Sequence, residues 1–147
     1  MFGKSEEGNV KTLHGHIAHT TTGFHVAAQN LKPVMHLIEA RMGLKALVPG
    51  TLNIRIDQDY IVLPDASISP REYGFNETVK LQRCIISGRK AIIMRPDSHE
   101  TRPNCGHGKD HLELMNPLYL RTELNLRDGD RVTVEVEGGE DWWAAGR

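Results

Sequence analysis

The sequence predicts a mainly β domain, either an antiparallel barrel or a sandwich. Short segments in which apolar and polar residues alternate recur along the chain, and this two-residue period is typical of strands with one buried face. Only residues 29–43 show the three-to-four-residue apolar spacing of a helix. Because short strands with few helices between them pair as antiparallel neighbours, a parallel α/β sheet is disfavoured.

The amino-terminal half is expected to hold a strand, a helix and a second strand. Residues 10–19 alternate between apolar and polar side chains. The helix over residues 29–43 has Pro33 in its first turn, where a missing N–H costs little, and Gly43 as a C-terminal stop. Residues 51–57 alternate again and are expected to form the second strand.

The carboxy-terminal half is expected to be a series of strands joined by turns and two longer loops. Strands are expected at residues 78–87, 90–94, 111–115 and 132–136, with a short helical turn at 117–124. Residues 64–77 are rich in turn formers, and residues 95–110 contain almost nothing to bury, so both segments are expected to be loops.

One domain accounts for the length of 147 residues. We expect a loose arm over residues 1–9, a single domain over residues 10–137 and a tail over residues 138–147. The tail is expected to be mobile unless its two tryptophans dock.

The composition disfavours several classes of protein. The 18 basic and 19 acidic residues give a net charge of −1, which argues against salt-driven binding of nucleic acid. No apolar run approaches the roughly 20 residues of a membrane span, so neither nucleic acid nor a membrane is an expected partner. Two cysteines are too few for a disulfide scaffold and indicate a reducing, cytoplasmic location. The near-neutral charge leaves the oligomeric state open.

Two polar residues at the start of a predicted strand form the first candidate site. Thr51 and Asn53 are two positions apart, so their side chains point to the same side of the strand. Hydroxyl and amide oxygens suit Mg²⁺, which takes few protein ligands and completes its shell with water and phosphate oxygens. The alternative is a turn followed by an ordinary polar strand face.

A single carboxylate in a later strand forms the second candidate. Glu113 stands between Leu112 and Leu114, where it could accept hydrogen bonds from the polar edge of a ligand. Arg121 could bind a phosphate. The alternative is a solvated strand face and a surface arginine. The chain lacks the glycine-rich motifs of common α/β nucleotide-binding domains.

The eight histidines suggest a third candidate, a transition-metal site. Two segments would have to meet to build it, and zinc is the metal that suits such ligands. The ligands would be drawn from His14, His16, His19, Cys105, His107 and His111. The alternative is a set of solvent-facing histidines on a hairpin and a loop.

Taken together, three blocks in this order resemble the archaeal-type CTP-dependent riboflavin kinases. They are PGTLN at 49–53, LELMNPLYLR at 112–121 and LRDGD at 126–130 with the strand that follows. The resemblance runs over most of residues 10–137. It implies a compact six-stranded barrel of the cradle-loop (RIFT) type, with a helix inserted after the first hairpin. It also implies a kinase, a phosphotransferase with an alcohol acceptor, which uses CTP and Mg²⁺ to convert riboflavin into FMN.

The resemblance implies roles for the matched positions. Thr51 and Asn53 would bind Mg²⁺, and Glu113 and Thr101 would contact the flavin. The nucleoside triphosphate would be held by Thr20, Thr21, Thr22, Gly23, Leu118, Tyr119, Leu120 and Arg121.

One departure from that family motivates two alternative functions. The family has a glycine-rich loop after its first strand, whereas residues 18–25 here contain Gly23 as the only glycine. A first alternative is a barrel that has lost the kinase reaction and holds Zn²⁺ at the histidine and cysteine positions, as a hydrolase or a sensor. A second is a non-catalytic module that binds a flavin or a nucleotide.

Overall fold

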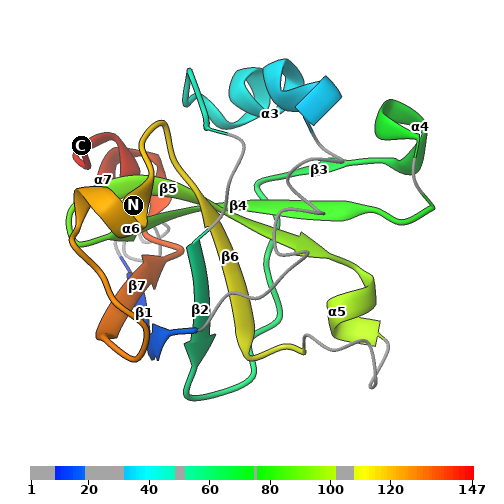
Figure 1. Cartoon of the computed structure of the whole chain (residues 1–147). Helices are drawn as coiled ribbons and strands as arrows, with labels where there is room; N and C mark the ends of the chain where they lie inside the picture. The colour runs from blue at the N-terminus through cyan, green and yellow to red at the C-terminus, as the bar shows by residue number, and fades with distance from the viewer. Residues whose placement is uncertain (1–8, 19–31, 49–51, 75, 102–107) are drawn as a thin grey trace.

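Antiparallel strands close into a barrel in the computed structural model, which describes residues 9–18, 32–48, 52–74, 76–101 and 108–147 (Figure 1). The strands of these ranges are β1 (Lys11–Ile17), β2 (Leu52–Ile56), β3 (Ala66–Ile68), β4 (Val79–Ile86), β5 (Arg89–Pro96), β6 (His111–Met115) and β7 (Arg131–Val136). Their order in the sheet is β3-β4-β5-β6-β2-β1-β7, and an additional pairing of β4 with β7 closes the barrel and leaves β3 outside it. The predicted mainly β class and the closed six-stranded barrel are confirmed.

The helices of the described residues are short. They are the 3-10 helix η1 (Lys32–Val34), α3 (Met35–Met42), α4 (Pro70–Tyr73), α5 (Ser98–Thr101), α6 (Leu120–Glu123) and α7 (Gly139–Ala144). Within this part of the chain, none has the length and apolar character needed to cross a membrane. η1 and α3 form the helix predicted between the first two strands, and residues 29–31 lie outside the described ranges. Gly43 ends α3 at φ 73°, and its N–H donates to the Glu39 carbonyl oxygen.

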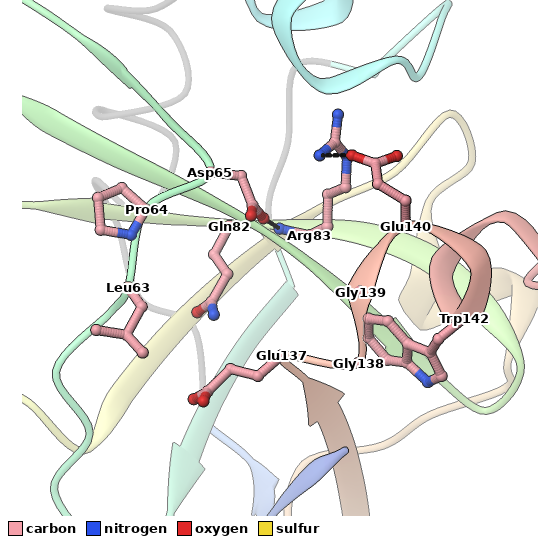
Figure 2. A pocket seen from close by; sticks show the side chains of 10 residues that line it. All are labelled: Leu63, Pro64, Asp65, Gln82, Arg83, Glu137, Gly138, Gly139, Glu140 and Trp142. Atoms are coloured by element: carbon pink, nitrogen blue, oxygen red, sulfur yellow. Dashed lines mark hydrogen bonds and ion pairs between the residues drawn. The ribbon is translucent and has the colours of Figure 1, made fainter. Parts of the chain in front are cut away.

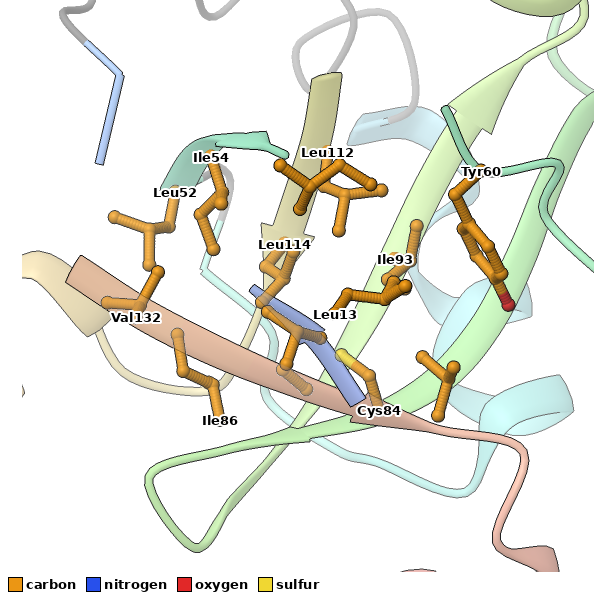
Figure 3. Packing of buried hydrophobic residues seen from close by; sticks show 14 of the residues in the cluster. Leu13, Leu52, Ile54, Tyr60, Cys84, Ile86, Ile93, Leu112, Leu114 and Val132 are labelled. Carbon is orange, nitrogen blue, oxygen red and sulfur yellow. The ribbon is translucent and has the colours of Figure 1, made fainter. Parts of the chain in front are cut away.

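Inward-pointing side chains of the barrel strands form the main hydrophobic core (Figure 3). Members that are 1% exposed or less include Leu13, Ile17, Ile54, Ile86, Ile93, Leu112, Leu114, Val134 and Val136. Each such burial contributes about 1.5–3 kcal/mol. Gly15 faces inward without a side chain, because a Cβ there would lie 2.4 Å from the Arg55 carbonyl oxygen of β2.

A second apolar cluster covers the outer face of β4, β5 and β6 on the side of α3. It contains Ile38 and Met42 of α3 together with Ile92 and Met94 of β5 and Met115 of β6. Because strand residues alternate in direction, polar residues beside these positions on the same outer face can also be buried. The candidate site described below borders this cluster.

Two segments predicted to be loops contain regular structure. Residues 64–77 hold β3 and α4, because Ile68 is fully buried in the outer cluster and Ser69 and Glu72 form a capping box at α4. Residues 95–110 begin with the last two residues of β5 and continue into α5, whose Glu100 is anchored by buried partners. The loop prediction was wrong at these elements, and residues 102–107 lie outside the described part.

The carboxy-terminal segment docks on the barrel through Trp143. This side chain is 5% exposed, and its Nε1–H donates to the Cys84 carbonyl oxygen at 3.1 Å. Arg83 and Lys90 lie over its ring, 5.1 and 4.9 Å from the centroid. The segment was expected to be mobile unless its two tryptophans dock, and Trp143 does dock. The division into arm, barrel domain and tail stays a prediction.

A buried arginine closes one end of the barrel. Arg95 points inward at the end of β5 and is 0% exposed. Its Nη1 donates to the Tyr60 carbonyl oxygen at 2.8 Å and to Glu100 Oε2 at 2.9 Å. Its Nη2 donates to the carbonyl oxygens of Lys109 at 3.2 Å and His111 at 2.9 Å. The guanidinium thus joins β5 to three segments, which are the segment at Tyr60, α5 and residues 109–111.

Glu100 balances the charge of this buried end. Besides Arg95, its carboxylate accepts hydrogen bonds from Lys80 Nζ and from the Val62 N–H. Burial alone would raise the pKa of Glu100, but these hydrogen bonds and the two nearby cations hold the pKa below its ordinary value. Burial lowers the pKa of Arg95, and Glu100 acts in the opposite direction.

We expect Glu100→Gln to lower the free energy of unfolding by about 3–5 kcal/mol, because it leaves two cations without their buried counter-charge. The pKa of Glu100 is depressed in the folded state, so its stabilising effect is complete above about pH 4.5, its ordinary value, and is lost as the pH falls through the lowered pKa. Urea titrations between pH 3 and 7 measure both effects.

Glu140→Gln is the matched control for this prediction. Glu140 also pairs with an arginine, Arg83, but its side chain is 79% exposed. Its loss should cost less than about 1 kcal/mol. Equal losses in the two variants would contradict the role given to the buried pair.

Candidate functional site

Three polar side chains share the outer face of β2 and β6. Asn53 and Glu113 are direct partners in the register of these strands. Their neighbours Leu52, Ile54, Leu112 and Leu114 belong to the barrel core, so alternation turns Asn53 and Glu113 outward. His111 is two residues before Glu113 and faces the same way. Partners in such a register have Cβ atoms about 4.5–5.5 Å apart.

This polar group is buried although it lies outside the barrel. Asn53, Glu113 and His111 are 4%, 5% and 3% exposed. His111 Nε2 lies 3.0 Å from Asn53 Oδ1. An amide oxygen can only accept a hydrogen bond, so in this arrangement Nε2 carries the proton. The His99 ring of α5 meets the His111 ring edge to face, with 6.3 Å between the centroids.

Buried apolar side chains adjoin the carboxylate. Met94 of β5 is the register partner of Glu113 on its other side, and it is 1% exposed. Met94 and Met115 belong to the outer apolar cluster. A carboxylate beside such side chains can accept hydrogen bonds from the polar edge of a ligand.

A second set of predicted residues meets at the end of β1. The Ala18 N–H donates to the carbonyl oxygen of Asn53 at 3.0 Å. Arg121 Nη2 donates to the Ala18 carbonyl oxygen at 3.5 Å, and Arg121 Nη1 lies 2.8 Å from Asp128 Oδ1. The start of β2, the end of β1 and α6 therefore adjoin at one end of the barrel. The cationic side chain there is 39% exposed and pairs with Asp128.

Residues 118–120, at the start of α6, include both exposed and buried side chains. Leu118 and Tyr119 are 46% and 58% exposed, whereas Leu120 is buried in the main core. Leu120 can therefore offer a ligand only its backbone. Asn116 fixes the approach to α6, because its amide donates to the Lys90 carbonyl oxygen and accepts from the Leu118 N–H at 2.7 Å.

Several predicted site residues lie outside the described ranges or apart from this group. Thr101 ends α5, is exposed, and donates its hydroxyl to the Asp97 carbonyl oxygen at 3.1 Å. The predicted residues outside the described ranges are Thr20, Thr21, Thr22, Gly23, Thr51, His19, Cys105 and His107. The sequence interpretation had no role for His99.

The described histidines of the alternative metal site lie on two strands, His14 and His16 on β1 and His111 on β6. His16 of β1, Arg55 of β2 and His111 of β6 occupy one row across the sheet, with Arg55 in the middle. Two strand spacings, about 10 Å, separate the outer two backbones. His14 lies near Asp57, whose pKa is lowered chiefly by its hydrogen bond from Arg131. Among the residues that the structure describes, no three His, Cys, Asp or Glu side chains are arranged to hold a metal ion.

A pocket lies between β4 and the segment that follows β7 (Figure 2). It has a volume of about 260 Å³ and is lined by the segment 63–65, by Gln82 and Arg83 of β4 and by residues of the segment 137–142. The Tyr60 hydroxyl oxygen lies 2.7 Å from Gln82 Oε1 and 3.2 Å from Glu137 Oε2. None of the residues predicted from the sequence to form a site lines this pocket.

Known proteins resemble the chain over most of its length. Residues 21–136 match the family model CTP-dep_RFKase, whose description reads "Domain of unknown function DUF120". A riboflavin kinase of Pyrobaculum arsenaticum is 33% identical over 125 residues, which cover 77% of this chain and 53% of that protein. A riboflavin kinase of Methanopyrus kandleri is 32% identical over 112 residues, which cover 67% of this chain and 66% of that protein. The chain spans about half the length of the first of these relatives.

We expect Arg121→Gln to change the free energy of unfolding by less than about 1 kcal/mol. Its ion pair with Asp128 is partly exposed on both sides, at 39% and 47%, and such pairs contribute little. Thermal or urea unfolding measures this directly. A loss of several kcal/mol would show that Arg121 is a structural residue and would remove it from the surface available to an anion.

Proposed function

The chain belongs to the CTP-dependent riboflavin kinase family, and from this premise we propose that it phosphorylates riboflavin to FMN. In this reaction the 5′-hydroxyl oxygen of riboflavin forms a bond to the terminal phosphorus of a CTP-type nucleoside triphosphate. The bond from that phosphorus to the bridging oxygen breaks, the hydroxyl proton is released, and the nucleoside diphosphate leaves. The proposed partners are small molecules, and the proposed location is the cytoplasm.

The register of Asn53 with Glu113 is the observation that supports this proposal most. The residue proposed to bind the cation and the residue proposed to contact the flavin come from distant parts of the sequence. They are nevertheless neighbours on the outer face of β2 and β6. Phosphoryl transfer needs both substrates held in line, and positioning with charge neutralisation supplies most of its catalysis. A cation site next to a site for the phosphoryl acceptor, riboflavin, would hold both substrates close together.

The oxygen donors at this position fit Mg²⁺. A carbonyl oxygen has two lone pairs, so Asn53 Oδ1 can accept a hydrogen bond and bind a cation at once. Thr51 and Asn53 would hold the ion, and one or two such protein ligands are usual for Mg²⁺ at phosphate sites. The ion supplies neutralisation of the negative charge on the phosphate oxygens.

The remaining roles fall to side chains around this pair. Glu113 would orient the flavin by accepting hydrogen bonds from its polar edge, beside the apolar side chain of Met94. Arg121, next to the end of β1, would bind the phosphates together with residues 20–23. Thr101 would be a second flavin contact, which requires α5 to approach the ligand.

The direct test is to incubate the protein with riboflavin and Mg²⁺ and with CTP, ATP, GTP or UTP in turn, and to measure FMN by chromatography. We expect FMN to form fastest with CTP. Faster formation with another donor would overturn the choice of CTP alone. The absence of FMN with every donor would contradict the kinase proposal, and flavin binding without turnover would favour a binding module.

We expect Asn53→Ala to lower kcat by roughly 100-fold or more, since several kcal/mol of charge stabilisation depend on a correctly held cation. The variant also removes the acceptor of His111, which costs about 1–3 kcal/mol of stability. Steady-state kinetics at saturating Mg²⁺ and unfolding curves measure the two effects separately.

Gln82→Ala is the matched control for this variant. Gln82 is another buried amide, 3% exposed, but it lies on β4, which does not pair with β2, and its side chain contacts the Tyr60 hydroxyl. It should lose comparable stability and keep its turnover. Unchanged turnover in the Asn53→Ala protein would remove Asn53 from the proposed cation site.

A further inference from the structure

We propose that the pocket between β4 and the segment after β7 is a second binding site, which takes a small molecule with a carboxamide group. The volume of the pocket, about 260 Å³, is just below the range of roughly 300–1,000 Å³ that is typical of sites for drug-sized ligands. It therefore suits a ligand with a single ring. The inference does not depend on the proposed function, because none of the residues proposed for the kinase reaction lines this pocket.

A buried amide lines the pocket. Gln82 of β4 is 3% exposed, and its Oε1 lies 2.7 Å from the Tyr60 hydroxyl oxygen. The nitrogen of the same amide has no hydrogen-bond partner among the described residues. Buried polar groups are normally hydrogen-bonded, and each exception needs an explanation. A ligand in the pocket would supply the missing partner.

The carboxylate of Glu137 lies next to this amide. Glu137 Oε2 is 3.2 Å from the same Tyr60 hydroxyl oxygen, so both side chains converge on one atom. Figure 2 shows the Gln82 amide extending toward Glu137. The hydroxyl has a single proton and cannot donate to both neighbours. Glu137 therefore keeps lone pairs for a donor on a ligand.

The backbone at Glu137 supports a role in binding. Its φ of 66° lies in the left-handed region, which residues other than glycine adopt only rarely. Backbone conformations of this kind cluster at ligand sites, where the surrounding structure maintains them. Here the conformation occurs where the chain passes from β7 to α7, and it accompanies the approach of the Glu137 side chain to Gln82.

The rest of the lining restricts the class of ligand further. Arg83 is already engaged, because its Nη1 donates to Glu140 Oε1 at 2.9 Å and its N–H donates to Asp65 Oδ2 at 2.7 Å. Carboxylates outnumber cations in the lining, so phosphates and other anions are disfavoured. The apolar part of the lining, which a ring can contact, consists of Leu63, Pro64 and Trp142.

A carboxamide has the donors and acceptors that this lining requires. Its N–H donates to Glu137, and its carbonyl oxygen accepts from the NH₂ group of Gln82. Because two amides complement each other in either orientation, the match does not depend on which end of the Gln82 amide faces the pocket. A carboxylate ligand offers no donor, and an amidinium ligand offers no acceptor.

Three probes of the same shape test this pattern, which are benzamide, benzoate and benzamidine. Binding is followed by NMR through the indole N–H signals, with Trp142→Phe to assign them. Trp142 lines the pocket, whereas Trp143 is buried and bonded to the Cys84 carbonyl oxygen. We expect benzamide to shift only the Trp142 signal, with a Kd of about 1 mM, since a ligand of so few atoms gains little affinity. Benzoate should bind at least about 10-fold more weakly.

Two variants test the residues that make the site. Gln82→Met removes the amide and keeps the length of the side chain, and Glu137→Gln removes the charge and keeps the size. Each should weaken benzamide binding by about 5–10-fold through the loss of one hydrogen bond or of its charge. Glu137 is exposed, so Glu137→Gln should keep the wild-type unfolding midpoint even where Gln82→Met lowers it.

Glu123→Gln is the matched control, because it also removes one carboxylate but Glu123 pairs with Arg89 and does not line the pocket. It should bind benzamide as the wild type does. The absence of a Trp142 shift with benzamide, or equal affinities for benzamide and benzoate, would overturn the proposal. Unchanged benzamide binding in both Gln82→Met and Glu137→Gln would overturn it too. Binding of benzamidine without binding of benzamide would show only attraction of a cation to carboxylates and would overturn the carboxamide class.

Discussion

The buried guanidinium of Arg95 is the interaction on which the rest of the structure depends. A charge that is wholly removed from water is tolerated only when it is paired and hydrogen-bonded. Four of its five N–H groups donate to three carbonyl oxygens and to Glu100, while Nε has no partner among the described residues. Those acceptors belong to three parts of the chain, which are the segment at Tyr60, helix α5 and the start of β6. One side chain therefore fixes how these three parts meet at the end of the barrel that Arg95 closes.

The contacts of Arg95 also fix the geometry of the candidate site. Arg95 holds the backbone of His111, His111 contacts Asn53, and the register of β2 with β6 sets Glu113 opposite Asn53. The outer apolar cluster buries the same face of the sheet from the side of α3. The polar group therefore lies on rigid strands, and such a site needs little reorganisation when substrates bind. Arg121 joins it from α6 by way of the end of β1.

The sequence predicted most strands and the single longer helix, because two-residue and helical periods are local properties. It missed β3, because three strand residues make too short a pattern to recognise. It also missed α4, although the capping box of Ser69 and Glu72 is visible in the sequence. Asn53 and Glu113 were each singled out, but their pairing is a non-local register that no local pattern contains. His111 was grouped with the other histidines rather than with Asn53 for the same reason.

The central claim, that the outer face of β2 and β6 holds the catalytic cation, is tested most directly by anomalous diffraction. Crystals of the protein grown with Mn²⁺ and CDP would be measured near the manganese edge. The account predicts a peak within coordination distance, about 2 Å, of Asn53 Oδ1, on the face that also carries Glu113. A peak elsewhere, for example beside His14 and His16 of β1, or nucleotide density with no peak at Asn53, would contradict it.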